Sequence, residues 1–268
     1  MGRANRYLLP GQISHLTHRC HNREFLLRFA RDRNAYLFWL REGLRRYPVT
    51  LLGYCITCNH VHLIVHGGAT EAVSELMGLL EGQVGQRYNR RKGREGGFWS
   101  DRFHGTMIDR GEYLWNCLTY VDLNMVRTGV VPDPGQWRWC GYAELVGTGR
   151  KVPLVNWERL AELLGCSGVE QLRQRWRQQI AFRLQQVTQR REPCWTEAVA
   201  VGRREYVDWV SNAVAGRQRW DIQSEANRGG LEFWTIRETA AEYRGSKNHP
   251  GIATNWPVLV KNSCANRS

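Results

Sequence analysis

Apolar residues recur every three or four positions in two long segments of the first half of the chain. The segments run from Phe29 to Arg46 and from Val73 to Arg90. In the first, the apolar residues at this spacing are Phe29, Tyr36, Leu37, Leu40 and Leu44, and in the second they are Val73, Leu76, Met77, Leu80, Val84 and Tyr88. Because residues three and four apart share one side of a helix, the pattern predicts two amphipathic helices.

Shorter apolar stretches flank these helices. We predict them as strands, over Gln12–His18, Val49–Thr57, His60–His66 and Gly105–Asp109. A third helix is predicted from Glu112 to Met125. The order strand, helix, strand, strand, helix, strand, helix contains split β-α-β units. It predicts an α+β fold with a ferredoxin-like antiparallel sheet and helices on one face.

Two histidines stand two residues apart in the third predicted strand. Side chains at this spacing point to the same face of a sheet, so His60 and His62 can grip a metal ion together. The alternative for an isolated pair is that one imidazole packs in the core and the other meets solvent. Tyr120 and Asn124, four apart on the third predicted helix, project from one helix face. A phenol, a carboxamide and two imidazoles together suit a site that cleaves phosphodiesters.

Three motifs follow one another along the chain. They are Asn59-His60-Val61-His62-Leu63, then Tyr120-x-x-x-Asn124, then Met125-Val126-Arg127-Thr128-Gly129-Val130-Val131. Together they resemble the motifs of the HUH single-tyrosine transposases of bacteria, most closely the REP-associated tyrosine transposases. Residues 16–19, 87–91, 98–104 and 137–142 resemble further segments of that family, so the resemblance covers about residues 1–165. Cys58 and Met125 depart from it, since the family has proline there.

The resemblance implies a fold and a chemistry. The fold is the same ferredoxin-like sheet, with an extra helix that carries Tyr120 across the sheet face bearing the two histidines. Tyr120 would be the nucleophile that forms a 5′-phosphotyrosine link, and His60, His62 and Asn124 would bind Mg²⁺ or Mn²⁺. On hardness alone, two imidazoles favour Mn²⁺. The implied partner is single-stranded or hairpin DNA, with REP-like palindromes as substrate, bound by a monomer or a homodimer.

Other residues compete for some of these roles. Tyr113 lies on the same predicted helix as Tyr120, seven residues earlier, but it has Cys117 rather than a hard ligand at the fourth position after it. Tyr120 is therefore the preferred nucleophile. His18 and His104 are minor candidates for groups near DNA at the ends of their strands.

The charge of the chain favours a polyanionic partner. Lys and Arg number 38 against 25 Asp and Glu, a formal charge of +13, and the chain holds 12 Trp and 10 Tyr. Phosphate binding combined with base stacking fits this composition better than a merely solvated basic surface. The candidate phosphate contacts are Arg19, Arg87, Arg90, Arg91, Lys92, Arg102, Arg127, Arg173, Arg175 and Arg177. The last three lie on a predicted helix, 169–191, in which no acidic residue stands between Arg173 and Arg191. Charge of one sign favours a surface that follows a nucleic-acid backbone.

We divide the chain into a catalytic core, 1–131, a segment that completes the core, 132–165, and a basic, mainly helical extension, 166–268. Helices are expected at Arg203–Ala215 and Ile236–Arg244, and Lys247–Ser268 is expected to be mobile. No stretch approaches the roughly 20 apolar residues of a membrane span. The N-terminus lacks the apolar segment of a signal peptide, so we expect a cytoplasmic protein that does not bind membranes.

The sequence therefore predicts a metal-dependent DNA transesterase, a transposase that nicks and joins single strands. Two alternatives stay open. The first is an HUH replication initiator or relaxase, which uses the same chemistry. The second is a noncatalytic nucleic-acid-binding module on the same kind of sheet, which would bind without metal and without a covalent adduct.

Overall fold

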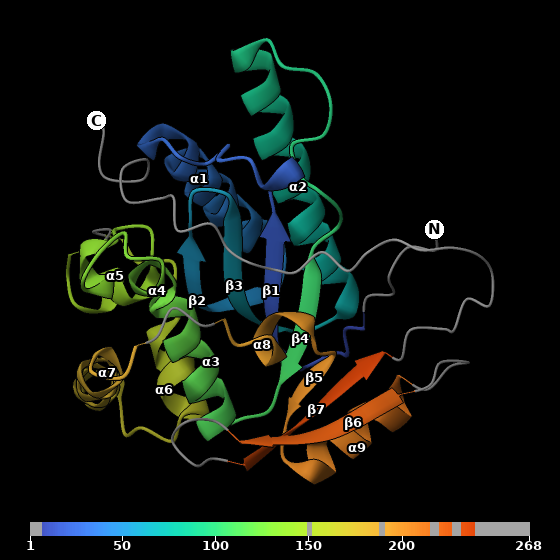
Figure 1. Ribbon diagram of the computed structural model, residues 1–268, viewed down its shortest axis with the longest axis vertical. Coiled ribbons are helices and arrows are strands. Elements are labelled where there is room, and N and C mark those ends of the chain that lie inside the picture. The colour runs from blue at the N-terminus through green and yellow to red at the C-terminus, as the bar shows by residue number, and fades with distance from the viewer. Residues whose placement is uncertain (1–6, 149–151, 188–190, 215–219, 227–231, 239–268) are drawn as a thin grey trace, which may run out of the picture.

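The computed structural model describes residues 7–148, 152–187, 191–214, 220–226 and 232–238 (Figure 1). The segment 247–268, expected to be mobile, lies outside these ranges. The helices are α1 Ala30–Arg46, α2 Thr70–Lys92, α3 Glu112–Asp122, α4 Asn124–Arg127, α5 Gly141–Leu145, α6 Trp157–Leu163, α7 Val169–Leu184, α8 Cys194–Glu197 and α9 Arg204–Ala213, with short 3₁₀ turns η1 His21–Arg23 and η2 Pro134–Gln136. Within the described ranges, no helix has both the length and the apolar content needed to cross a bilayer.

The described strands form one sheet in the order β2-β3-β1-β4-β5-β7-β6. They are β1 Ile13–Arg19, β2 Val49–Ile56, β3 His60–Gly67, β4 His104–Ile108, β5 Ala200–Gly202, β6 Trp220–Ala226 and β7 Glu232–Glu238. The pairs among β1 to β4 are antiparallel, whereas β4 and β5 are parallel. The α+β class and the antiparallel order of the first four strands are confirmed, and their bounds differ from the predicted ones by no more than one residue.

Helices cover both faces of the first part of the sheet. On one face, Val73 of α2 packs against Gly67 of β3, and Leu76 of α2 packs against Gly43 of α1. On the other face, Leu118 of α3 packs against Gly53 of β2, so closely that a β-carbon on Gly53 would lie 2.7 Å from the leucine Cδ2. Figure 1 shows α3 and α8 on this second face. The glycine lets α3 lie directly on the strands.

The third predicted helix, 112–125, is not continuous. Helix α3 ends at Asp122, and Leu123, with φ −79° and ψ 5°, separates it from the short helix α4. The prediction of one helix through Met125 is therefore wrong at its end. The break comes just before Asn124, whose amide is hydrogen-bonded to His62 on the sheet. That tertiary contact outweighs the local preference to continue the helix.

The C-terminal region holds helices, as predicted, but it also extends the sheet. Helix α9 confirms the helix expected at Arg203–Ala215, while the arginine-rich helix expected over 169–191 ends at Leu184. The helix expected at Ile236–Arg244 is wrong, because residues 232–238 form β7, and the remaining residues lie outside the described ranges. Strand β7 pairs with β5 on one side and β6 on the other, and this pairing decides its conformation.

Candidate active site

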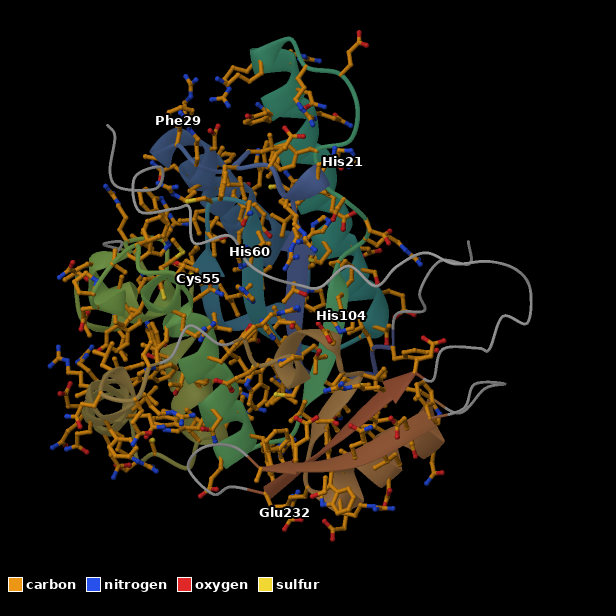
Figure 2. All side chains as sticks on the ribbon, viewed as in Figure 1. His21, Phe29, Cys55, His60, His104 and Glu232 are labelled. Carbon is orange, nitrogen blue, oxygen red and sulfur yellow. The ribbon has the colours of Figure 1, made fainter. Side chains whose placement is uncertain are left out.

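The register of the central strands gathers polar side chains on the face covered by α3 and α8. Thr17 of β1 lies opposite both His62 of β3 and His104 of β4, and Arg19 lies opposite His60. Directly opposed residues in antiparallel strands project from the same face. Figure 2 labels His60 and His104, which lie on either side of β1 over the middle of the sheet.

These residues line a cavity of about 570 Å³. Its wall includes His60, His62, Tyr120 and Asn124, which come from β3, α3 and α4. The structure therefore brings together the four residues that the sequence singled out for metal binding and nucleophilic attack. The rings of His60 and His62 are 4.9 Å apart and nearly perpendicular.

The hydrogen bonds of His60 fix its tautomer. Its Nδ1 lies 2.8 Å from Oδ1 of Asn59 and 2.9 Å from Oγ1 of Thr57. The Asn59 amide is oriented by its Nδ2, which donates to the carbonyl oxygen of Arg23, and the Thr57 hydroxyl donates to the carbonyl of His60. Both oxygens near the ring thus accept, so Nδ1 carries the proton. The lone pair of His60 is on Nε2.

A chain of hydrogen bonds fixes His62 in the same way. Nδ1 of His15 donates to the carbonyl of Trp195 at 2.7 Å, so in the neutral ring Nε2 of His15 accepts from Nδ1 of His62 at 2.9 Å. Nε2 of His62 therefore carries a lone pair, to which Nδ2 of Asn124 donates at 2.9 Å. Burial lowers the pKa of His60 to about 3 and of His15 to about 4, and it also lowers the pKa of His62. All three imidazoles are neutral at pH 7.

The Asn124 side chain has an unsatisfied oxygen. Its Oδ1 is buried and has no hydrogen-bond partner among the described residues. Leaving such an acceptor unpaired costs about 1–3 kcal/mol. Turning the amide over would place Oδ1 against the lone pair of His62, which also repels it. A cation would satisfy both atoms, so two imidazole nitrogens and this amide oxygen are a set of donors that fits a divalent metal ion.

The set is small. Across the described ranges, no three His, Cys, Asp or Glu side chains gather as a metal site. A cation held by His60, His62 and Asn124 would thus keep coordination positions for water or for oxygen atoms of a substrate, as divalent ions in phosphoryl-transfer sites do.

Tyr120 lies beside the imidazoles. Its ring centroid is 6.0 Å from that of His62 and 6.2 Å from that of His15. The guanidinium of Arg127 lies 4.0 Å from the centre of the Tyr120 ring, and its Nη1 donates to the Tyr120 carbonyl at 2.7 Å. Burial raises the pKa of the Tyr120 phenol, and the positive charge of Arg127 acts in the opposite direction.

Tyr113 lies outside this cavity. It is near the start of α3, and its hydroxyl donates at 3.4 Å to the carbonyl of Glu232, which Figure 2 shows well away from His60. The cavity wall includes Tyr120 but not Tyr113. Geometry thus separates the two tyrosines that the sequence placed on one helix.

The predicted phosphate contacts divide into two groups. Arg19, Arg102 and Arg127 line the cavity. The other group does not line it and consists of Arg87, Arg90, Arg91, Lys92, Arg173, Arg175 and Arg177. Several of these have local partners: Arg91 is paired with Asp32, and Arg173 with Glu170. On the evidence of position, the first group is the one that can meet a phosphate at the reacting centre.

Sequence reasoning missed several residues of the cavity wall. Arg191 and Phe25, whose side chain is 39% exposed, line the cavity, and His15 and Trp195 support it from behind. His15 could have been found from the strand pattern, because it alternates with Thr17 and Arg19 on one face of β1. No local signal marks Trp195, since its place depends on a contact with His15 over 180 residues of chain. Arg191 is paired with Glu197 beside α8, and that segment reaches the sheet only through such long-range contacts.

Part of the chain is similar to known proteins. Residues 11–123 match the family model described as transposase IS200 like. No curated protein gives a significant match. Among solved structures, the fold is similar to that of a REP-associated tyrosine transposase bound to a REP hairpin, with 18% identity and a TM-score of 0.47 over 55% of this chain and 86% of that one. The family match contains β1 to β4, His60, His62 and Tyr120.

Proposed function

We propose that the protein cleaves and rejoins a DNA strand through a covalent link to Tyr120, since residues 11–123 match the family model described as transposase IS200 like. One observation supports this most. The centre of the Tyr120 ring lies 6.0 Å from that of His62, in a cavity whose wall also includes Asn124 with its unsatisfied oxygen. A nucleophile and a set of metal ligands on one wall are what phosphodiester transesterification needs.

The reaction is a balanced exchange of one phosphoester for another. The phenolic oxygen of Tyr120 attacks phosphorus, a P–O bond to tyrosine forms, and the P–O3′ bond breaks. The phenol gives up its proton and the O3′ leaving group takes one up, so the products are a 5′-phosphotyrosine and a free 3′-hydroxyl. Attack of a 3′-hydroxyl on the phosphotyrosine reverses these changes and rejoins the strand without ATP.

The chain's own residues would prepare this step. His60 and His62, each through Nε2, and Asn124, through Oδ1, would hold Mg²⁺ or Mn²⁺. Such an ion, when bound, neutralises charge on the non-bridging phosphate oxygens. Arg127 holds the backbone and ring of Tyr120, and its charge favours loss of the phenolic proton.

The proposed substrate is single-stranded DNA, presented next to a hairpin of the REP type. Arg19, Arg102 and Arg191 line the same cavity as Tyr120 and would bind phosphates on either side of the reacting one. Phe25 stands partly exposed at that wall and offers a face on which an unpaired base can stack.

A labelled hairpin oligonucleotide with a single-stranded flank tests the proposal. Wild-type protein with Mn²⁺ should bind a 3′-labelled strand covalently and release a 5′-labelled strand with a free 3′ end. His62→Ala should abolish both products, because it removes a ligand. His66→Ala is the matched control on the same strand, outside the cavity wall, and should retain them. Adduct formation in EDTA would contradict the metal role, and binding without any adduct would favour a noncatalytic module.

A further inference from the structure

The segment around α8 lies against the candidate active site and contacts the sheet there. Its carbonyl oxygens accept hydrogen bonds from three side chains of the sheet: Trp195 from His15, and Ala198 from both His104 and Thr106. This segment lies some 70 residues beyond the end of the part that matches the transposase family. A region outside the family match therefore contacts the same face of the sheet, beside the metal-ligand candidates.

The contact with His15 reaches the proposed metal ligand in one further step. His15 is fully buried and accepts the Nδ1 proton of His62, while its own Nδ1 proton is held by the Trp195 carbonyl. No solvent reaches His15 to replace either bond. The carbonyl therefore sets the His15 tautomer, and His15 sets the tautomer and ring orientation of His62.

We propose that His15 is a positioning residue for the metal ligand His62, and that the C-terminal segment at α8 completes the site by holding His15 through the Trp195 carbonyl. The inference rests on the proposed metal-dependent function. It assigns the C-terminal region a part in building the catalytic centre, in addition to any contact with DNA.

The physical reason is the direction of the lone pair. With Nδ1 protonated, His62 has its lone pair on Nε2, the atom that faces Asn124. Without an acceptor at Nδ1, the ring is free to carry its proton on Nε2, where it blocks binding of a cation. Partners that orient a metal-bound histidine typically change metal affinity by about 10–100-fold when they are removed.

Three variants separate positioning from packing. His15→Phe keeps a ring of similar size but removes both hydrogen bonds. His15→Gln restores an oxygen that can accept from His62. Thr106→Val is the matched control: it is nearly isosteric, equally buried, and removes a 2.7 Å bond to the same C-terminal segment without touching His62.

Two measurements decide the inference. Mn²⁺ affinity, measured by titration calorimetry or electron paramagnetic resonance without DNA, should fall about 10–100-fold in His15→Phe and change little in His15→Gln and Thr106→Val. Long-range ¹H–¹⁵N spectra of the metal-free protein should show His62 protonated on Nδ1 in the wild type and on Nε2 in a large fraction of His15→Phe.

The outcomes distinguish this inference from the function on which it rests. If the wild type binds no Mn²⁺, the proposed metal site fails and the inference with it. If the wild type binds Mn²⁺ and His15→Phe binds it equally well with His62 in the same tautomer, only the positioning role is overturned. An equal loss of affinity in Thr106→Val would also overturn it, because general loosening of α8 would then explain the effect.

Discussion

Adding a single carbon at Gly53 on β2 should displace helix α3, which carries Tyr120. A β-carbon there would lie 2.7 Å from Cδ2 of Leu118, which is 1% exposed on α3, two residues before Tyr120. Non-bonded carbons prefer about 3.5–4.0 Å, so the contact is too short by roughly 1 Å. Gly53→Ala should therefore cost about 1–3 kcal/mol as an overpacked core, and lower the melting temperature by about 2–4 °C for each kcal/mol.

A double-mutant cycle measures this contact. Leu118→Ala alone creates a cavity and should cost about 2–5 kcal/mol. In the Gly53→Ala background the added methyl occupies part of that cavity, so the same change should cost at least about 1 kcal/mol less. Urea unfolding of the four proteins gives the coupling free energy. Additive effects would show that α3 does not rest on Gly53 in the way the structure describes.

The same variant connects packing to chemistry. Displacing α3 moves Tyr120 relative to His62, and a shift of about 1 Å at a reacting group can cost roughly 100-fold in rate. Gly53→Ala should therefore slow formation of the DNA adduct by more than it weakens DNA binding. Equal rates in Gly53→Ala and the wild type, in spite of a lower melting temperature, would mean that the helix position is not rate-limiting.

Two further predictions concern pH and the basic surface. Burial lowers the pKa of His18 from 6.5 to about 4 in the folded protein. Protonation of this imidazole therefore favours the unfolded chain. The free energy of unfolding that depends on neutral His18 is fully present above pH 6.5 and is lost as the pH falls toward 4. His18→Phe, which loses the bond to the Asp101 carbonyl, should be less stable than wild type at pH 8 but lose up to about 3 kcal/mol less on acidification in urea unfolding; parallel pH profiles would refute this. Glutamine at Arg173, Arg175 and Arg177 together should leave adduct formation intact at saturating DNA, and a fall of about 2–3 in the slope of log K against log salt would place α7 on DNA.

The first half of the fold follows from local pattern. Period-two and period-3.6 hydrophobicity mark β1 to β4, α1 and α2 to within a few residues, because each element buries one face against its neighbours in sequence. Strands β5 and β7 carry no comparable signal. Strand β5 pairs with the edge of β4, about 90 residues earlier in the chain, and β7 pairs with β5 in turn. Local pattern does not contain pairings over such distances.

The candidate site divides in the same way. His60 and His62 share a face by strand geometry alone, and Tyr120 stands over them because α3 follows β4. Asn124 reaches His62 by a different route from the one expected, since the helix breaks at Leu123. The helical register with Tyr120 thus correctly placed Asn124 near the site, but it did not predict the helix break that precedes the contact of Asn124 with His62.

The contact that holds His15 in place could not be predicted from the sequence. The carbonyl that holds His15 belongs to Trp195, and a backbone oxygen has no residue type to recognise. Charge patterning also singled out α7, but Arg173 is paired with Glu170 one turn earlier and does not line the cavity. A contact of α7 with DNA away from the cavity stays a prediction. Position, rather than charge, separates these arginines from Arg19 and Arg127.

The central claim is that one oxygen atom, the hydroxyl of Tyr120, attacks DNA. Tyr120→Phe removes that atom and keeps the ring that packs against Arg127, His15 and His62, so folding and hairpin affinity should change little. Incubation of wild type, Tyr120→Phe and Tyr113→Phe with a 3′-labelled hairpin oligonucleotide and Mn²⁺, followed by denaturing electrophoresis and mass spectrometry of the linked peptide, tests it directly. A nucleotide should be attached to Tyr120 in the wild type and in Tyr113→Phe, and none in Tyr120→Phe. A covalent adduct that persists in Tyr120→Phe would contradict it.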